Sequence, residues 1–190
     1  MNIDFSLIRS APKRRNDSFE ALAVQLFRKT CRVPTNSTFI SLRGDGGDGG
    51  VEAYFRSPDG AVFGVQAKYF FQLASAELTQ IDSSLKAALS NHPTLTEYWI
   101  YIPFDLTGRV AAGKRGKSQA ERFEEWKSKV ESEASAKGKP LSIVLCTAAV
   151  ICNQLLEIDP YGGMRRYWFD DTLLTTAQIQ QCLEDAIAFA

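Results

Sequence analysis

Four carboxylates, one amide and one amine lie within a single short stretch of the sequence, residues 43–69. The stretch reads RGDGGDGGVEAYFRSPDGAVFGVQAKY and contains Asp48, Glu52, Gln66 and Lys68. Carboxylate and amide oxygens are ligands of hard divalent cations, which also bind phosphate oxygens. A lysine beside such a cation stabilises the charge that develops on a phosphate. This set of side chains therefore indicates metal-assisted hydrolysis of a phosphodiester bond.

The predicted cation is Mg2+, and Mn2+ is an alternative with a similar preference for oxygen ligands. Glu52, Asp48 and Gln66 are the predicted ligands, and the sequence leaves open whether Glu52 or Asp48 is the main one. Such a cation lowers the pKa of a bound water and neutralises charge on the phosphate. Lys68 is expected to orient that water or to stabilise the developing charge.

Two strands are needed to bring these residues together. Glu52 alternates with small or apolar residues in VEAYF, and Gln66 and Lys68 do so in AVFGVQAKYF. Because successive side chains of a strand point to opposite faces, the three polar residues are expected to converge on the side of the sheet opposite the core. The turn RSPDG joins the two strands as a hairpin. The glycines before Val51 are expected to let a nucleic-acid backbone approach closely.

The rest of the chain alternates between strand and helix patterns. Strands are predicted at residues 38–43, 97–103 and 141–146, and helices at 17–29, 78–89, 118–137, 147–158 and 175–190. Asn16 or Asp17 is the predicted cap of the first helix and Ser75 that of the second, which should end before His92. The alternation favours an α/β or α+β fold in which helices cover both faces of a central sheet.

Length and composition indicate one ordinary globular domain. The 190 residues suffice for a single core, and 22 acidic residues balance 22 basic ones, so no global charge draws the chain to nucleic acid. Four scattered cysteines without a CxxC pair and a single histidine disfavour a zinc site. The sequence shows neither an apolar leader nor a membrane-length apolar run, which predicts a cytoplasmic protein with reduced cysteines and no membrane partner.

At these residues the sequence resembles the PD-(D/E)xK nucleases, and within them the Mrr-type branch, in which a DGG-V/I-D segment precedes a QxK strand. The matching segments are DGGVE at residues 48–52 and QAK at residues 66–68. The resemblance implies a restriction-endonuclease-like central mixed β-sheet flanked by helices, with Glu52, Gln66 and Lys68 as the catalytic set. It also implies that an acid of the first helix, Glu20, adds to the site. The chain has glutamate at position 52, where the branch usually has aspartate.

More narrowly, the segments GDGGVEAYF, VQAKYF, IPFDLTG and RFEEW resemble the amino-terminal nuclease domain of AVAST-type STAND NTPases, which are bacterial antiphage proteins. The similarity spans residues 19–126. It implies a nuclease acting on double-stranded DNA, followed in a longer chain by an NTPase module and a sensor domain that recognises a phage protein and brings nuclease domains together. The predicted helix at 175–190 has no stop signal, which also favours residues 1–190 as one N-terminal domain of a longer protein.

Several of these residues have simpler interpretations. Gly44, Gly46 and Gly49 satisfy GxGxxG, but a strand follows them in place of the required helix, and the neighbouring aspartates would repel a phosphate. A calcium loop is disfavoured because the acids lack EF-hand spacing. Glu20 is either part of the site or a helix-capping glutamate. Lys68, without its neighbours, would be interpreted as a solvated strand lysine.

Basic residues occur in two runs, at positions 13–15 and 109–117. Lys114, Arg115 and Lys117 are candidates for nucleic-acid contacts, and a solvated surface is the alternative. Two further functions fit the sequence: a nuclease-like domain that has lost catalysis and serves binding or oligomerisation, and a nuclease directed at RNA. The presence of Gln66 and Lys68 disfavours the first of these. No feature of the sequence distinguishes a DNA substrate from RNA.

Overall fold

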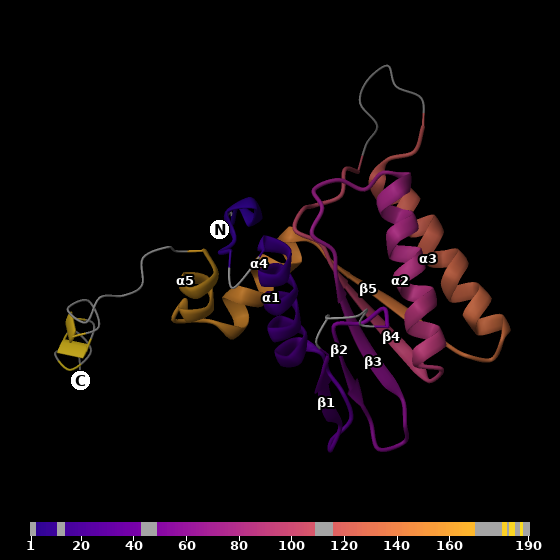
Figure 1. Ribbon diagram of the computed structural model, residues 1–190, viewed down its shortest axis with the longest axis horizontal. Helices are drawn as coiled ribbons and strands as arrows, with labels where there is room; N and C mark the ends of the chain where they lie inside the picture. The colour runs from indigo at the N-terminus through magenta and orange to yellow at the C-terminus, as the bar shows by residue number, and fades with distance from the viewer. Residues whose placement is uncertain are drawn as a thin grey trace.

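The computed structural model describes residues 3–10, 14–42, 49–108 and 116–169, and near the C-terminus residues 180, 181, 183, 184 and 187. The described part has three layers, in which a five-stranded mixed sheet lies between two groups of helices (Figure 1). The predicted α/β fold with helices on both faces of a central sheet is therefore confirmed.

The strands lie side by side in the same order as they occur along the chain. They are β1 (Thr38–Ser41), β2 (Ala53–Arg56), β3 (Val62–Ala67), β4 (Leu95–Tyr101) and β5 (Ser142–Cys146). The pairs β1–β2 and β2–β3 are antiparallel, whereas β3–β4 and β4–β5 are parallel. The parallel pairs arise because a helix connects each strand to the next and returns the chain in the same direction. β3 is the central strand, at which the two pairing modes meet.

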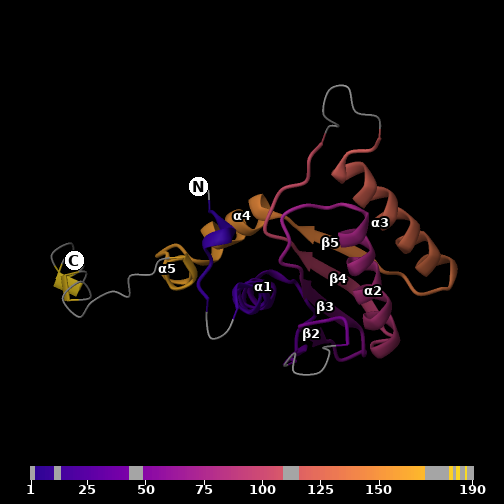
Figure 2. The same cartoon turned by 45° about the horizontal axis from the view of Figure 1, so that its top comes forward.

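Helices cover both faces of this sheet. One group consists of the 3-10 helix η1 (Phe5–Leu7), α1 (Arg15–Thr30), α4 (Ala148–Ile158) and α5 (Gly163–Phe169). The other group consists of α2 (Ser75–Asn91) and α3 (Gln119–Ala136). The two views in Figures 1 and 2 place these groups on opposite sides of the strands. Each helix buries an apolar stripe against the sheet, which is the usual reason for such a layered arrangement.

Two apolar cores lie on the two sides of the sheet. The core beneath α1 contains Ala53, Phe55 and Val65, as the alternation of the strands predicts. Tyr54 belongs to the second core, beneath α2 and α3, and Val51 joins it there. The alternation of VEAYF predicts that Val51 shares a side with Ala53, and this is wrong, because Val51 lies two residues before the start of β2 and strand alternation does not extend that far.

The start of α1 differs from the prediction. The helix begins at Arg15, with Arg14 at the N-cap position and no side-chain hydrogen bond to the cap. Asn16 and Asp17, the predicted caps, lie inside the first turn instead. An acid such as Asp17 is favourable there, because the free N–H groups of the first turn carry a partial positive charge.

The boundaries of α2 confirm one prediction and correct another. The helix ends at Asn91, immediately before His92, as predicted. Its N-cap is Ala74, and Ser75 is the first helical residue instead of the cap. Glu77 replaces the missing cap from inside the helix, because its Oε2 accepts a hydrogen bond of 2.9 Å from the Ala74 backbone N–H.

Three further points concern the ends of the predicted elements. Residue 43, the predicted end of the first strand, and most of the predicted helix at 175–190 lie outside the described residues. The short helix α5 was not expected from the sequence. None of the described helices combines the length and the apolar character needed to cross a lipid bilayer.

Candidate active site

A polar cavity of about 450 Å3 lies where the start of β2 and the end of β3 meet the first turns of α1 and α2. It is lined by four of the predicted site residues, Glu20, Glu52, Gln66 and Lys68. Its other lining residues are Asn16, Ala67, Tyr69, Phe70, Glu77 and Gln80. The structure therefore brings together side chains from both helical layers and from the two central antiparallel strands.

The backbone of Glu52 is fixed on both sides by neighbouring strands. Its N–H donates to the carbonyl of Val65 at 2.8 Å, and its carbonyl accepts from the N–H of Leu42 at 2.9 Å. These bonds extend the ladders of β1, β2 and β3 by one residue beyond the start of β2. The carboxylate is consequently anchored at the end of the sheet, and only 7% of the residue is exposed.

The two glycines before Val51 pack against the protein itself. Gly50 has φ of 89°, and a Cβ atom placed on it would lie 2.1 Å from the carbonyl oxygen of Ser84 in α2. The Tyr98 hydroxyl donates to the Gly50 carbonyl at 2.7 Å, and the Asn91 side chain donates to the Gly49 carbonyl at 3.2 Å. These two glycines therefore allow the loop to approach α2, and the expectation that they also admit a nucleic-acid backbone stays a prediction. The glycines at 44, 46 and 47 lie outside the described residues.

Gln66 provides the most informative contact in the cavity. Its side-chain nitrogen donates to Oε1 of Glu52, and also to the carbonyl of Ala67 at 3.2 Å. Its side-chain oxygen is buried and has no hydrogen-bond partner among the residues that the structure describes. Buried polar atoms are rarely left without a partner, so an orphaned amide oxygen beside a buried carboxylate fits a cation or a water bound between them. The atoms of Glu52 and Gln66 that could coordinate the cation are all oxygens, which suits Mg2+ or Mn2+.

Lys68 lies immediately beyond β3 and is half-buried. Its backbone N–H donates to the carbonyl of Tyr101 at 2.9 Å, which continues the parallel pairing with β4 by one residue. Within the described part of the chain the Lys68 ammonium forms no ion pair, so it is available to a ligand in the cavity. Its position at a strand end, instead of within the strand, gives the long side chain access to the cavity.

Glu20 belongs to α1 and is half-buried. The alternative interpretation of Glu20 as a helix cap is wrong, because α1 begins at Arg15 and Glu20 lies beyond its first turn. Glu20 and Glu52 also line together a neighbouring depression that includes Asp17. Two carboxylates from different elements thus border the same polar space.

The reason for this convergence differs from the one predicted. The alternation pattern places Glu52, Gln66 and Lys68 on a polar face opposite a single core, but each face of this sheet carries a core of its own. The three residues meet at the strand ends, where the helical layers of the two faces diverge. The alternation of side chains along a strand shows which residues share a face of the sheet. It does not show where the helices that cover that face end.

Three polar helix residues of the cavity were missed by sequence reasoning: Asn16, Glu77 and Gln80. Glu77 and Gln80 lie three positions apart in α2, a spacing that places them on one side of a helix. That spacing was visible in the sequence. However, a polar pair on one side of a helix is normally solvated, and only the packing of α2 shows that it borders the cavity.

The remaining predicted residues are not brought to the cavity by the described structure. Asp48, Lys114 and Arg115 lie outside the described residues. Lys117 forms an exposed ion pair of 2.5 Å with Glu125 of α3. Among the described residues, no group of three or more histidine, cysteine, aspartate or glutamate side chains is arranged to hold a metal ion. A cation held by the described residues would therefore also need the amide oxygen of Gln66.

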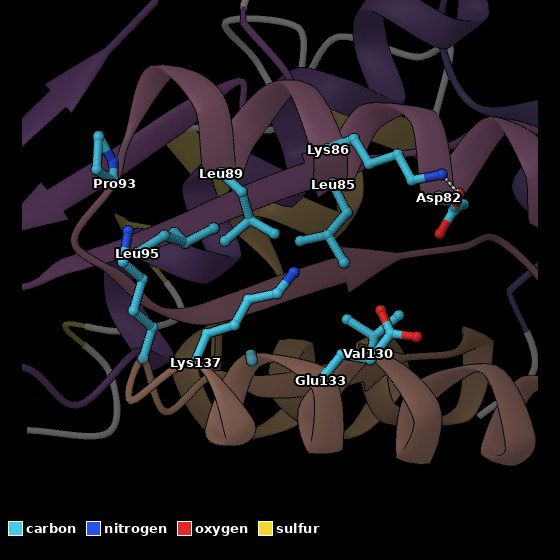
Figure 3. A pocket seen from close by; sticks show the side chains of 11 residues that line it. Asp82, Leu85, Lys86, Leu89, Pro93, Leu95, Val130, Glu133 and Lys137 are labelled. Atoms are coloured by element: carbon cyan, nitrogen blue, oxygen red, sulfur yellow. Dashed lines mark ion pairs between the residues drawn. The ribbon is translucent and has the colours of Figure 1, made fainter.

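A second cavity of about 300 Å3 lies between α2 and α3 (Figure 3). Its walls are mainly apolar, and Leu85 and Leu95 are almost fully buried beneath it. At its edge Lys86 reaches Asp82 at 2.7 Å, so these two charges neutralise each other (Figure 3). None of the predicted site residues lines this cavity, and it offers no convergent polar atoms for catalysis.

The chain matches no protein-family model and no curated protein. The functional interpretation therefore depends on the chemistry of the cavity.

Proposed function

We propose that the protein is a metal-dependent endonuclease with a restriction-endonuclease-like fold, which hydrolyses phosphodiester bonds of double-stranded DNA. The observation that carries the proposal is the shared cavity of Glu20, Glu52, Gln66 and Lys68, in which a buried amide oxygen has no partner within the described part of the chain. A site that gathers carboxylates, an unsatisfied amide oxygen and a lysine without an ion pair suits the reaction better than it suits a structural role.

Each residue has a defined part in the proposed reaction. Glu52, oriented by the amide of Gln66, holds Mg2+ or Mn2+ together with the free oxygen of Gln66. The cation, when bound, supplies a water of lowered pKa and neutralises charge on the phosphate. Glu20 borders the same space and accepts a hydrogen bond from a water there. Lys68 stabilises the negative charge that develops on the phosphate oxygens in the transition state.

The wider proposal is that this nuclease is the effector domain of an antiphage NTPase. In that setting an NTPase module and a sensor domain of the same protein recognise a phage protein and activate cleavage by oligomerisation. The similarity of residues 19–126 to such effector domains supports this setting. The zero net charge also supports it, because a chain with little nonspecific affinity for DNA gains cleavage activity when several copies are held together.

The experiment is plasmid degradation by the purified chain, alone and forced into dimers, with and without Mg2+. We expect Mg2+-dependent cleavage that is weak for the monomer and stronger for the dimer. A structured RNA assayed in parallel tests the RNA-directed alternative. If neither DNA nor RNA is cleaved by the dimer while a cation still binds the cavity, the domain is the catalytically inactive, binding or oligomerising alternative and the proposal is wrong.

A further inference from the structure

The loop between β3 and α2 presents an aromatic ring beside the cavity. Tyr69 and Phe70 line the cavity, and Phe71, the next residue, is 49% exposed. A single exposed apolar side chain needs no explanation by itself. The position of Phe71 is nevertheless distinctive, because the residue directly before it lines the polar cavity that would receive a phosphate.

The ring of Phe71 packs on Tyr69, which in turn packs on the buried ring of Phe19. The Phe71 ring meets that of Tyr69 edge-on, with 5.0 Å between centroids and 77° between planes. Tyr69 in turn packs against the buried ring of Phe19 at 5.6 Å and donates its hydroxyl proton to the carbonyl of Phe5 at 2.9 Å. The supporting ring is therefore fixed by the core. A ring that rests on a fixed support loses less conformational freedom when it binds a ligand.

We propose that Phe71 is a stacking platform for a nucleobase of the substrate strand, next to the phosphate bound in the cavity. This inference rests on the proposed nuclease function and adds a feature of the substrate. Aromatic side chains bind bases of any sequence by stacking on their faces. The faces of paired bases are covered by their neighbours, so the base that meets Phe71 must have left the duplex stack. On duplex DNA the site consequently acts where bases near the scissile phosphate are unpaired, as at an end, a bubble or a single-stranded segment.

A double-mutant cycle between Phe71 and the bases tests this inference. Binding of a fluorescent DNA strand is measured by anisotropy in Mg2+, with every protein carrying Lys68→Ala to suppress cleavage. A second strand has the same sugar-phosphate backbone without bases. Phe71→Ala is expected to weaken binding of the normal strand by about tenfold, the usual effect of losing one stacked base, and to leave binding of the base-free strand unchanged. Phe71→Trp should retain the affinity.

Tyr161→Ala is the matched control, because Tyr161 is an aromatic residue that is 94% exposed and lies between α4 and α5, away from the cavity. It should bind both strands like the parental protein. The inference is overturned if Phe71→Ala binds the normal strand with unchanged affinity. It is also overturned if Phe71→Ala loses the same affinity for the normal and the base-free strand, as a general structural effect would cause. An equal loss on DNA and RNA strands supports stacking, because both carry bases.

Cleavage by the parental chain forced into dimers is measured separately with Mg2+, so that the two proposals can fail independently. If Phe71→Ala loses affinity only for the strand that carries bases and no cleavage is seen, the nuclease function is refuted and the stacking platform remains. If cleavage is seen but Phe71→Ala shows no affinity loss specific to the bases, only the stacking platform is refuted.

Discussion

The side-chain amide of Gln66 donates a hydrogen bond to Oε1 of Glu52, although the two residues lie 14 positions apart and belong to different strand segments. Both residues are nearly inaccessible, with exposures of 4% and 7%. The amide nitrogen of Gln66 thus orients a carboxylate, and its amide oxygen has no hydrogen-bond partner in the described ranges of the chain. An arrangement of this kind is complete only when a ligand satisfies the free oxygen.

Mg2+ should therefore stabilise the folded chain. At ten times its dissociation constant a ligand of the native state adds about 1.4 kcal/mol to the free energy of unfolding, which corresponds to a rise of about 3–6 °C in Tm for a chain of this size. Glu52→Gln keeps the shape of the side chain and removes its charge, so this rise should disappear. The measurement is thermal unfolding across a Mg2+ titration. An equal rise in the parental chain and in Glu52→Gln would show that the cation binds elsewhere.

Lys68→Ala should impair catalysis without unfolding the protein. The side chain forms no ion pair among the described residues, and its removal should change the free energy of unfolding by no more than about 0.5 kcal/mol. The rate of DNA cleavage should fall on the order of a hundredfold to a thousandfold, because a preorganised charge stabiliser is lost. Added Mg2+ should rescue Glu52→Ala in part but not Lys68→Ala. Lys129→Ala on α3 is the control and should cleave normally; parental activity in folded Lys68→Ala would contradict the assigned role.

Gly50→Ala should destabilise the fold strongly. Its new Cβ would lie 2.1 Å from a backbone oxygen of α2, and φ of 89° is unfavourable for alanine. We expect a loss of about 3 kcal/mol from the combined clash and strain. Gly60→Ala separates the two effects, because Gly60 has φ of 88° but open space around it, and should lose only about 1 kcal/mol. Urea unfolding measures both; equal losses would mean that the approach to α2 is unimportant.

Two buried thiols should resist alkylation. Burial is the main cause that raises the pKa of Cys31 and of Cys146 to about 12. At pH 8 only about one thiol in ten thousand is then ionised, and the thiolate is the reactive form. Mass spectrometry of peptides after iodoacetamide treatment should find both residues unmodified in the native chain and modified in urea. Rapid alkylation of either residue without urea would show that the core around α1 opens.

His92 should make stability depend on pH below neutrality. Burial, and secondarily the charge of Arg56, lower its pKa below the ordinary value of 6.5. The unfolded chain therefore takes up a proton as the pH falls through 6.5 while the folded chain resists it, so the free energy of unfolding decreases on acidification. His92 is the single histidine of the sequence, which isolates the effect between pH 7.0 and about 5.5. Urea unfolding of His92→Gln should show a weaker pH dependence than the parental chain.

Local sequence patterns were sufficient for most of the secondary structure and for the chemistry of the site. The helices α1 to α4 and the five strands follow from apolar periodicity, and Glu52, Gln66 and Lys68 were identified by residue type and spacing. These features are local, because hydrogen bonds within a helix and alternation along a strand depend on neighbouring residues. The caps were predicted wrongly at Asp17 and Ser75, since several polar residues near a helix start can satisfy its free N–H groups equally well.

The surroundings of the site required the tertiary structure. The sequence by itself determined which side chains have the chemistry of a metal-assisted reaction, whereas the structure decided that Glu77 and Gln80 border the same cavity and that Gly50 packs against α2. It also decided that the amide oxygen of Gln66 is left without a partner. The physical reason is that burial, close approach and an unsatisfied hydrogen bond are relations between segments that are distant in the chain, and these exist only after the two helical layers have packed on the sheet.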